Sequence, residues 1–249
     1  MRLEWNGYFV ERMELTGKLA VVTGGTSGIG EAIAQRLAAD GMRVVICGRD
    51  PKRVAEAVER ITSRGFDALG HGCDVRSEEE IRAFGDWVRD TAGDPDVLVN
   101  NAGLGYLASF LDVTVEQIDE TFAVNVRGTM LMTREFLPGM LARESGHIVN
   151  ISSISGKNGF AGGTAYSASK HAVMGFAGSL MLEVRKSNVR VVTVCPGSVE
   201  TPFFDKAGME ISNAERILKP DDVAETVVAA LKLPDRALVS ELHIRPTNP

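Results

Sequence analysis

The chain has 249 residues, of which 44% are hydrophobic and 24% charged, and its formal net charge is −6. This length suits one α/β domain better than two small ones, and it allows a large core to be buried. The acidic balance argues against nucleic acid or an anionic membrane as the main partner, because both bind basic surfaces.

The N-terminal stretch, residues 1–13, carries charged side chains that exclude the apolar core of a signal peptide. It is an extension, a start upstream of Met13 or an additional strand, whereas residues 14–249 are predicted to form a single domain. The rest of the chain has no apolar run long enough to cross a membrane, so we expect no membrane partner and a cytoplasmic location.

Three cysteines, Cys47, Cys73 and Cys195, each lie at the end of an apolar run, and none belongs to a C-x-x-C pair. We therefore expect buried free thiols in a reducing cytosol rather than disulfides, and we predict no metal site.

Short apolar runs alternate with longer helical patterns along the chain. Strands are predicted at residues 19–24, 43–48, 67–75, 96–103, 147–153, 189–197 and 237–244. Helices are predicted near residues 28–40, 51–63, 77–92, 115–142, 164–187 and 220–232. This alternation predicts an α/β fold, a single doubly wound Rossmann-type domain with a mostly seven-stranded parallel sheet. Residues 197–219 lack clear periodicity and form either a lid over a substrate or an irregular connection.

The first predicted strand runs directly into "TGGTSGIG", in which Gly24, Gly28 and Gly30 follow the pattern T-G-x-x-x-G-x-G. Glycine allows the turn to take positive φ and allows backbone to approach a ligand closely. A helix is predicted to begin at once, so its free amides face the turn and can hold a pyrophosphate. A strand before the turn and a helix after it favour a nucleotide site over a merely tight turn.

The glycine spacing resembles that of the classical short-chain dehydrogenase/reductase family, and further family motifs follow in the same order. They are Asp74 in "CDV", Asn100–Gly103 in "NNAG", Asn125 in "VNVRG", Ser153 thirteen residues before Tyr166, the pair Tyr166 and Lys170 in "YSASK", and Pro196, Gly197 and Thr201 in "PGSVET". The resemblance covers about residues 17–245, and it implies an oxidoreductase that uses a nicotinamide dinucleotide.

The resemblance also implies roles for individual residues. The catalytic set is Asn125, Ser153, Tyr166 and Lys170. The cofactor-binding positions are Gly24, Thr26, Ser27, Gly28, Ile29, Gly30, Arg49, Asp74, Val75, Asn101, Ala102, Gly103, Tyr166, Lys170, Pro196, Gly197, Val199 and Thr201. His147 and His171 match no family role, and we expect both to be structural.

Carbonyl reduction needs a hydride on carbon, which the cofactor supplies, and a proton on oxygen, which a positioned acid supplies. Tyr166 and Lys170 are four residues apart and share one helix face. We expect the ammonium of Lys170 to lower the pKa of Tyr166 toward neutrality by favouring phenolate. By resemblance, Ser153 holds the substrate oxygen, Lys170 reaches the nicotinamide ribose, and Asn125 holds a water that links Lys170 to solvent.

Cofactor choice depends on the end of the second strand, "VVICGRD". NAD-preferring family members carry an aspartate at the position of Gly48, whereas a basic residue pairs with the 2′-phosphate of NADP. Gly48 leaves room and Arg49 brings positive charge, so we predict NADP(H). NAD(H) remains the alternative because Asp50 could bind the ribose, although before Pro51 it is better interpreted as a helix cap. Ser27 stands where some NADP-using members carry a second basic residue.

The predicted activity is the reversible reduction of a ketone or aldehyde by NADPH, with a small-molecule substrate. The loops at 104–112, 154–163 and 197–219 supply Leu104, Tyr106, Phe160, Phe203 and Phe204, which indicate an apolar pocket, and no arginine cluster marks an acidic substrate. The ending "SELHIRPTNP" differs from that of 3-oxoacyl-carrier-protein reductases in the family and resembles more the members that act on hydroxy acids, serine or assorted ketones, which weighs against the former activity. The alternatives are such a reductase, an NAD-dependent alcohol or hydroxy-acid dehydrogenase, and a non-catalytic dinucleotide sensor, which would typically lose the tyrosine.

Family members usually pair through their two long helices, here near 115–142 and 164–187. The segment "HAVMGFAGSLMLEV" is apolar on more than one face, which is typical of a helix that covers both its own sheet and a partner. We therefore predict a homo-oligomer, either a dimer or a tetramer.

Overall fold

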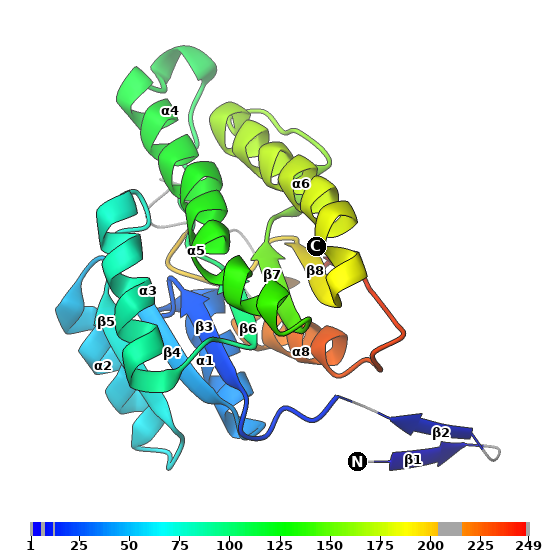
Figure 1. The fold of residues 1–249 in the computed structure, drawn as a ribbon. Coiled ribbons are helices and arrows are strands. Elements are labelled where there is room, and N and C mark those ends of the chain that lie inside the picture. The colour runs from blue at the N-terminus through cyan, green and yellow to red at the C-terminus, as the bar shows by residue number, and fades with distance from the viewer. Residues whose placement is uncertain (1, 6–7, 12, 204–215, 248–249) are drawn as a thin grey trace.

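The computed structural model describes residues 2–5, 8–11, 13–203 and 216–247. Near the N-terminus, β1 (Arg2–Trp5) and β2 (Tyr8–Glu11) form a two-stranded antiparallel sheet that stands apart from the rest of the molecule (Figure 1). The possible lid at 197–219 falls partly outside the described residues, and Phe204 lies within that part.

The main sheet is fully parallel and has the strand order β5-β4-β3-β6-β7-β8-β9. Its strands are β3 (Leu19–Thr23), β4 (Arg43–Gly48), β5 (Ala68–Gly72), β6 (Val97–Asn100), β7 (Gly146–Ile151), β8 (Val189–Pro196) and β9 (Glu241–Ile244). The central strands are buried along their whole length, as expected for a parallel sheet that is covered on both faces. The predicted doubly wound, seven-stranded fold is confirmed.

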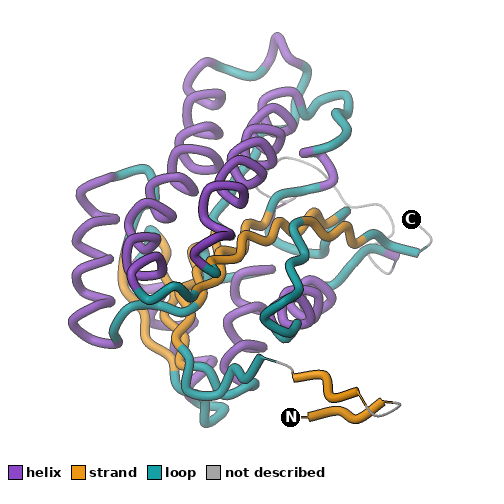
Figure 2. The backbone as a smooth tube through the Cα atoms, turned by 45° about the vertical axis from the view of Figure 1, so that its right-hand side comes forward, coloured by secondary structure: helices purple, strands orange, loops and turns teal. Residues whose placement is uncertain are grey.

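Helices cover both faces of this sheet (Figure 2). They are α1 (Gly28–Ala39), α2 (Pro51–Thr62), α3 (Glu78–Ala92), α4 (Val115–Phe122), α5 (Thr129–Ala142), α6 (Thr164–Val184) and α8 (Pro220–Leu231). One apolar core lies between the sheet and α1, α2 and α8, and a second lies between the sheet and α3, α5 and α6. None of the described helices is long and apolar enough to span a membrane.

The chain winds outward in opposite directions from β3 and β6. Strands β4 and β5 lie on one side of this pair, whereas β7, β8 and β9 lie on the other. The two sets of crossovers therefore diverge at the carboxyl ends of β3 and β6, where doubly wound folds bind their ligands.

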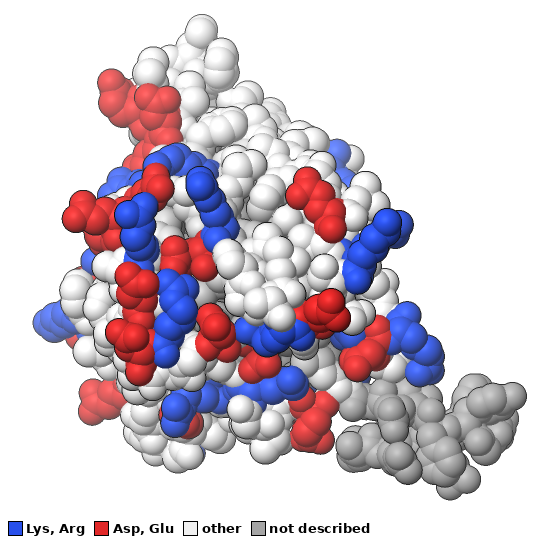
Figure 3. Space-filling view, in the orientation of Figure 1, with Lys and Arg blue, Asp and Glu red and all other residues white. Residues whose placement is uncertain are grey.

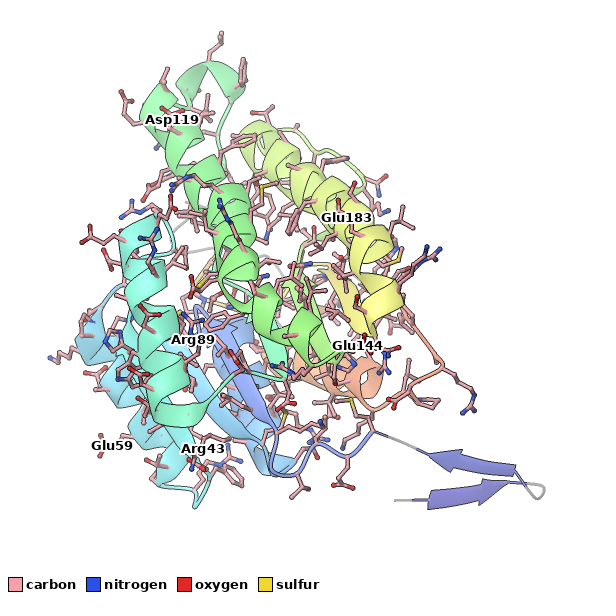
Figure 4. The ribbon with its side chains drawn as sticks, viewed as in Figure 1. Arg43, Glu59, Arg89, Asp119, Glu144 and Glu183 are labelled. Atoms are coloured by element: carbon pink, nitrogen blue, oxygen red, sulfur yellow. The ribbon has the colours of Figure 1, made fainter. Side chains whose placement is uncertain are left out.

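Polar contacts between α3 and α5 stabilise the helices on one face of the sheet. Arg89 of α3 points toward α5 (Figure 4) and donates hydrogen bonds to Asp86 and to Glu135 of α5. Gly85 faces the same glutamate, and a Cβ at this position would lie 2.1 Å from its Oε1. A larger side chain here would have to displace the Glu135 side chain from this contact.

The helix predicted over 115–142 is interrupted in the structure. Between α4 and α5 lies η2 (Ala123–Gly128), a π-helical segment that contains Asn125. The continuous apolar pattern gave no sign of this insertion, because the wider turn is fixed by tertiary hydrogen bonds. Such π-helical turns are frequent at functional sites.

Two other sequence-based expectations concern cysteines and His147. Cys47, Cys73 and Cys195 are free and buried, as predicted. His147 lies in β7, is 4% exposed, and has its Nε2 atom 3.0 Å from Nη1 of Arg190. Burial, assisted by the nearby charge of Arg190, lowers the pKa of His147 to about 4.

This shift predicts a loss of stability in mild acid. The unfolded chain takes up a proton on His147 near its ordinary pKa of 6.5, whereas the folded chain does so only near 4. The free energy of unfolding should therefore fall by about 1 kcal/mol per pH unit as pH drops from 6.5 to 4. Urea titrations across this range should show a flatter dependence for His147→Gln. The exposed His171 of α6 provides the matched control, and equal slopes for His147→Gln and His171→Gln would contradict the assignment.

Candidate active site

A cavity of about 960 Å³ opens at the carboxyl edge of the sheet, where the two sets of crossovers diverge. Residues from the ends of all seven strands, or from the loops directly after them, line it. Among the predicted site residues, the lining contains Gly24, Thr26, Ser27, Gly28, Ile29, Arg49, Asp74, Val75, Asn101, Ala102, Gly103, Ser153, Tyr166, Lys170, Pro196, Gly197, Val199 and Thr201. Gly30 and Asn125 lie behind this surface.

The turn after β3 is tied to the segment after β6. Thr23 Oγ1 accepts hydrogen bonds from the backbone amides of Asn101 and Ala102, each at 3.0 Å. The side-chain amide of Asn101 donates in return to the carbonyls of Thr23 and Gly24, at 3.0 and 3.1 Å. These bonds hold the two sides of the crevice at a fixed separation.

The glycine turn is shaped for close approach. Gly24 has φ of +65°, and a Cβ there would lie 2.9 Å from Cα of Ala102. Gly28 has φ of +58° and begins α1, so this turn requires glycine at both positions. Gly30 instead serves packing, because its Cβ would lie 2.3 Å from the side-chain nitrogen of Asn101. This packing explains why Gly30 does not reach the cavity.

The start of α1 fits a phosphate group. Ser27 is the N-cap residue, but its side chain makes no capping hydrogen bond to the first turn of the helix. The first amides of α1 therefore face the cavity end of the helix without a side-chain acceptor, together with the positive end of the helix dipole. Arg60 of α2 supports the turn from outside by donating to the carbonyl of Thr26 and pairing with Glu31. The residues present thus suit a dinucleotide pyrophosphate.

The two charged residues after β4, Arg49 and Asp50, have different roles. The carboxylate of Asp50 accepts from the amides of Lys52 and Arg53, so it is the cap of α2. Arg49 is exposed at the cavity rim, where Nη1 lies 3.5 Å from Oε1 of Glu120. A Cβ at Gly48 would lie 2.9 Å from Thr26, so a larger residue would crowd this rim.

An ion-pair network closes the rim at the ends of β5 and β6. Arg76 donates to both carboxylate oxygens of Asp74 and, at 2.8 Å, to Glu120. Burial alone would raise the pKa of Asp74, but the hydrogen bonds from Arg76 outweigh it and hold the pKa below its usual range. The hydroxyl of Tyr106 donates to Glu120, which joins the loop after β6 to α4. Tyr106, expected among the substrate contacts, therefore has its hydroxyl at this rim.

Tyr166 and Lys170 lie at the centre of the cavity. Tyr166 is held between the backbone of Gly105, where a Cβ would lie 2.7 Å from the ring, and Phe203, whose ring centroid is 5.3 Å away. Lys170 is buried, and its Nζ lies 5.7 Å from the centre of the Tyr166 ring. The helical spacing therefore brings the two side chains together, as the sequence predicts.

The pKa of Tyr166 differs from the sequence-based expectation. Burial raises it to about 12, although part of the ring still faces the cavity, and the hydrogen bond with Ser153 lowers it only in part. Lys170 does not lower it because Nζ donates instead to the carbonyl of Ile151, at 3.0 Å. Burial also lowers the pKa of Lys170 to about 8. Without a further positive charge in the cavity, Tyr166 is held as a protonated phenol.

Asn125 fixes the loop that packs on Tyr166. Its Oδ1 accepts from the amide of Leu104 at 2.9 Å, and its Nδ2 donates to the Leu104 carbonyl at 2.8 Å. Nδ2 also donates to Ser169 Oγ, and Ser169 in turn donates to the carbonyl of Tyr166. The π-helical turn at η2 lets Asn125 reach both the loop and α6, so its side chain is a positioning group in this structure.

Several lining residues were missed by the sequence analysis. Among them are Arg53, Gly105, Glu120, Arg216 and Arg245, of which Gly105 and Arg216 lie in loops expected to contact the substrate. None has a motif of its own, and each reaches the cavity only through the topology of the sheet. Within the described residues, no group of three or more His, Cys, Asp or Glu side chains could hold a metal ion.

Comparison with known proteins agrees with this geometry. The family model described as short chain dehydrogenase matches residues 18–211, which include the glycine turn and the pair Tyr166 and Lys170. The chain belongs to the short-chain dehydrogenase family. It is therefore an oxidoreductase of that family.

Relatives with similar sequences carry the same kind of description. An uncharacterized oxidoreductase of Staphylococcus saprophyticus is 39% identical over 235 residues, which cover 94% of this chain and 99% of that protein. A protein of Streptomyces violaceoruber, named as ketoacyl reductase 1 of the granaticin polyketide synthase, is 43% identical over 190 residues, or 76% of this chain and 70% of that protein.

Solved structures of the short-chain dehydrogenase family match nearly the whole chain. A metagenomic short-chain oxidoreductase in complex with NADP has 38% identity and a TM-score of 0.83, and the match covers 95% of this chain and 100% of that one. A short-chain dehydrogenase/reductase from Burkholderia phymatum in complex with NAD has 27% identity and a TM-score of 0.84, over 93% and 90% of the two chains.

Proposed function

We propose that this short-chain dehydrogenase reversibly reduces a ketone or aldehyde with NADPH, and that Tyr166 is its general acid and base. The observation that carries the proposal is the position of the Tyr166–Ser153 pair in the same cavity as the glycine turn and the start of α1. Dinucleotide and carbonyl compound would thus meet in one space.

The residues of the chain have separate tasks in this reaction. A reduced nicotinamide dinucleotide supplies the hydride when it is bound. Ser153 donates a hydrogen bond to the substrate oxygen and holds it near the phenol. Tyr166, which carries its proton at neutral pH, transfers that proton to this oxygen as the carbon–oxygen double bond becomes an alcohol.

Lys170 supports Tyr166 from the buried side. Its ammonium is held by the carbonyl of Ile151 and is directed to the space beside Gly103, where a Cβ would lie 3.6 Å from Nζ. This position suits contact with a ribose hydroxyl. In the oxidative direction, the positive charge of an oxidised nicotinamide would favour the phenolate of Tyr166, which Lys170 alone does not achieve.

The NADP preference rests on charge at the cavity rim. Asp50 is occupied as a helix cap, whereas Arg49 is exposed and, within the described part of the chain, forms an ion pair with Glu120 alone. A surface pair of this kind contributes about 1 kcal/mol or less, and hydrogen bonds from a guanidinium to a phosphate contribute about 1.5–3 kcal/mol. A 2′-phosphate would therefore displace Glu120 from Arg49. The NADP complex of a structural relative supports this choice, although another relative binds NAD.

Self-association would follow from the outer surface of α4, α5 and α6. Phe122, Met130, Leu141 and Leu182 are exposed there, and the area over α5 and α6 carries few charges in the view of Figure 3, unlike the area over α3. We therefore propose a dimer or tetramer that buries these side chains. Light scattering at micromolar concentration should give at least twice the monomer mass, and a monomer would contradict the proposal.

Replacing Tyr166 with phenylalanine tests the mechanism. Tyr166→Phe keeps the ring between Gly105 and Phe203 but removes the proton, so the reduction rate should fall by about 10²- to 10⁴-fold. NADPH affinity, measured by cofactor fluorescence, should change little. Turnover is followed by NADPH absorbance over diketones, keto esters, aldehydes and acyl thioesters. If Tyr166→Phe retained the wild-type rate, the assigned acid would be wrong.

Replacing Arg49 tests cofactor choice. Arg49→Ala should raise the KM for NADPH by about 10- to 100-fold, because guanidinium–phosphate hydrogen bonds are lost. The KM for NADH should stay within about threefold, because NADH has no 2′-phosphate for the guanidinium to contact. Glu120→Gln is the matched variant, since it frees Arg49 from its carboxylate partner and should leave the NADPH preference intact or increased. A wild-type enzyme that works faster with NADH would point to Asp50 instead.

A further inference from the structure

Two guanidinium groups lie at the substrate end of the cavity. Arg216 and Arg245 both line it, both are exposed, and neither forms an ion pair with any residue in the described ranges. Arg36, Arg60 and Arg76, by contrast, are each paired with a carboxylate. An unpaired arginine in a cavity wall is a ready site for an anion.

The sheet places Arg245 beside the reacting groups. Pro196 of β8 is opposite Ile244 of β9, and the amide of Gly197 donates to the carbonyl of Ile244 at 2.8 Å, so Arg245 follows at the level of Gly197. Ser153 follows β7, on the other side of β8. Neighbouring strands are about 4.8 Å apart, so the backbones of Ser153 and Arg245 are separated by roughly 10 Å, which an arginine side chain spans in large part.

Arg216 reaches the same cavity from another segment. Leu218 pairs with Val199 in a parallel bridge, and Arg216, two residues earlier, lines the cavity just before this paired segment. Gly197 also has Pro246 and Ile154 as neighbours, since a Cβ there would lie 3.1 Å from Pro246 and 3.3 Å from Ile154. Arg245 therefore lies beside Gly197, one residue beyond the level of Ser153, and Arg216 lines the same cavity.

The charges that line the cavity are divided between its two ends. The acidic lining residues among those described are Asp50, Asp74 and Glu120, and all three belong to the rim near β4, β5 and α4. Each is engaged there, by the amides of α2 or by Arg76. Among the lining residues that the structure describes, the end near β8 and β9 carries two arginines and no acidic residue. Its field therefore favours a negatively charged ligand.

We propose that Arg245, assisted by Arg216, binds a carboxylate of the substrate, so that the enzyme reduces keto acids and oxidises the corresponding hydroxy acids. This inference rests on the proposed function. The short distance from Ser153 requires the carboxylate to lie a few bonds from the carbonyl. A carrier-bound thioester lacks such a group, because its acyl carbon is esterified to sulfur.

The test compares keto acids with their methyl esters, which share the carbonyl and lack the charge. Pyruvate, acetoacetate and levulinate place the carboxylate progressively farther from the ketone. The acid that is preferred therefore reports the distance between the bound ketone and Arg245. The wild-type kcat/KM should be higher for at least one acid than for its ester. Arg245→Met should lower that value by about 10- to 100-fold, mainly through KM, and should leave the ester within about threefold.

Further variants separate charge from folding. Arg245→Lys should restore part of the acid preference, because charge returns without the paired geometry of a guanidinium. Arg216→Met should reduce the preference less than Arg245→Met does. Arg236→Met is the matched control, because Arg236 is exposed just before β9 and does not line the cavity. NADPH fluorescence titrations confirm that each variant retains its cofactor site.

The possible results distinguish this inference from the proposed function. If esters are reduced but no acid is preferred, or if Arg245→Met changes acid and ester equally, the carboxylate site is wrong and the reductase stands. A preference for acyl thioesters over every acid would likewise overturn it. If NADPH binds but no carbonyl compound is reduced, the proposed function itself fails.

Discussion

The hydroxyl of Thr23 joins the two strands between which the cavity opens. It accepts from the amides of Asn101 and Ala102 and donates to the carbonyl of Val99, so one side chain connects the end of β3 to the end of β6. These bonds also hold the start of the loop that leads to Gly105, which packs on Tyr166. Asn125 holds the same loop from the opposite side at Leu104. The loop is thus fixed before any ligand binds, which is the pre-organisation that catalysis requires.

Burial decides the electrostatics of the reacting pair. The sequence spacing brings Lys170 to Tyr166, but proximity along a helix does not fix where an ammonium points. Lys170 is directed to the carbonyl of Ile151, and burial raises the pKa of Tyr166 above its ordinary value. A protonated tyrosine is the form that carbonyl reduction needs. The site without ligand therefore holds the proton that reduction consumes, and a cationic ligand would lower the pKa of the phenol and favour its transfer.

The features that could be predicted from the sequence are those that depend on local sequence patterns. Buried parallel strands are continuous apolar runs, so their positions were predicted closely, and Asp50 before Pro51 was correctly interpreted as a cap. The π-helical turn at Asn125 escaped prediction because it depends on hydrogen bonds to Leu104 and Ser169, which are remote in sequence. The upward shift of the Tyr166 pKa was not predicted for a similar reason, since it depends on how deeply the packed structure buries the phenol.

Arg216 and Arg245 show the same limit for substrate recognition. They are separated in sequence by α8 and the strand β9, and neither belongs to a motif, so the chain gave no sign of an arginine pair. The pairing of Pro196 with Ile244 places Arg245 at the end of the sheet, and the pairing of Val199 with Leu218 brings the segment after Arg216 to the same cavity. A functional cluster that is assembled from distant segments cannot be recognised from sequence motifs. The glycine turn can be recognised, because it lies within one short segment.

The distribution of paired and unpaired charge around the cavity distinguishes two kinds of recognition. At the rim near Arg49, the acidic groups already have partners within the protein, and Glu120 is the partner of Arg49. The binding free energy that a phosphate gains from Arg49 is therefore reduced by the loss of the contact between Arg49 and Glu120. Near Arg245 no such competitor is described, so an anion gains the full interaction apart from its own desolvation. Selectivity between cofactors should therefore be graded, whereas discrimination between charged and neutral substrates should be steep. Because both sites share one cavity and lie at opposite ends of it, each charge also helps to orient its ligand toward Tyr166.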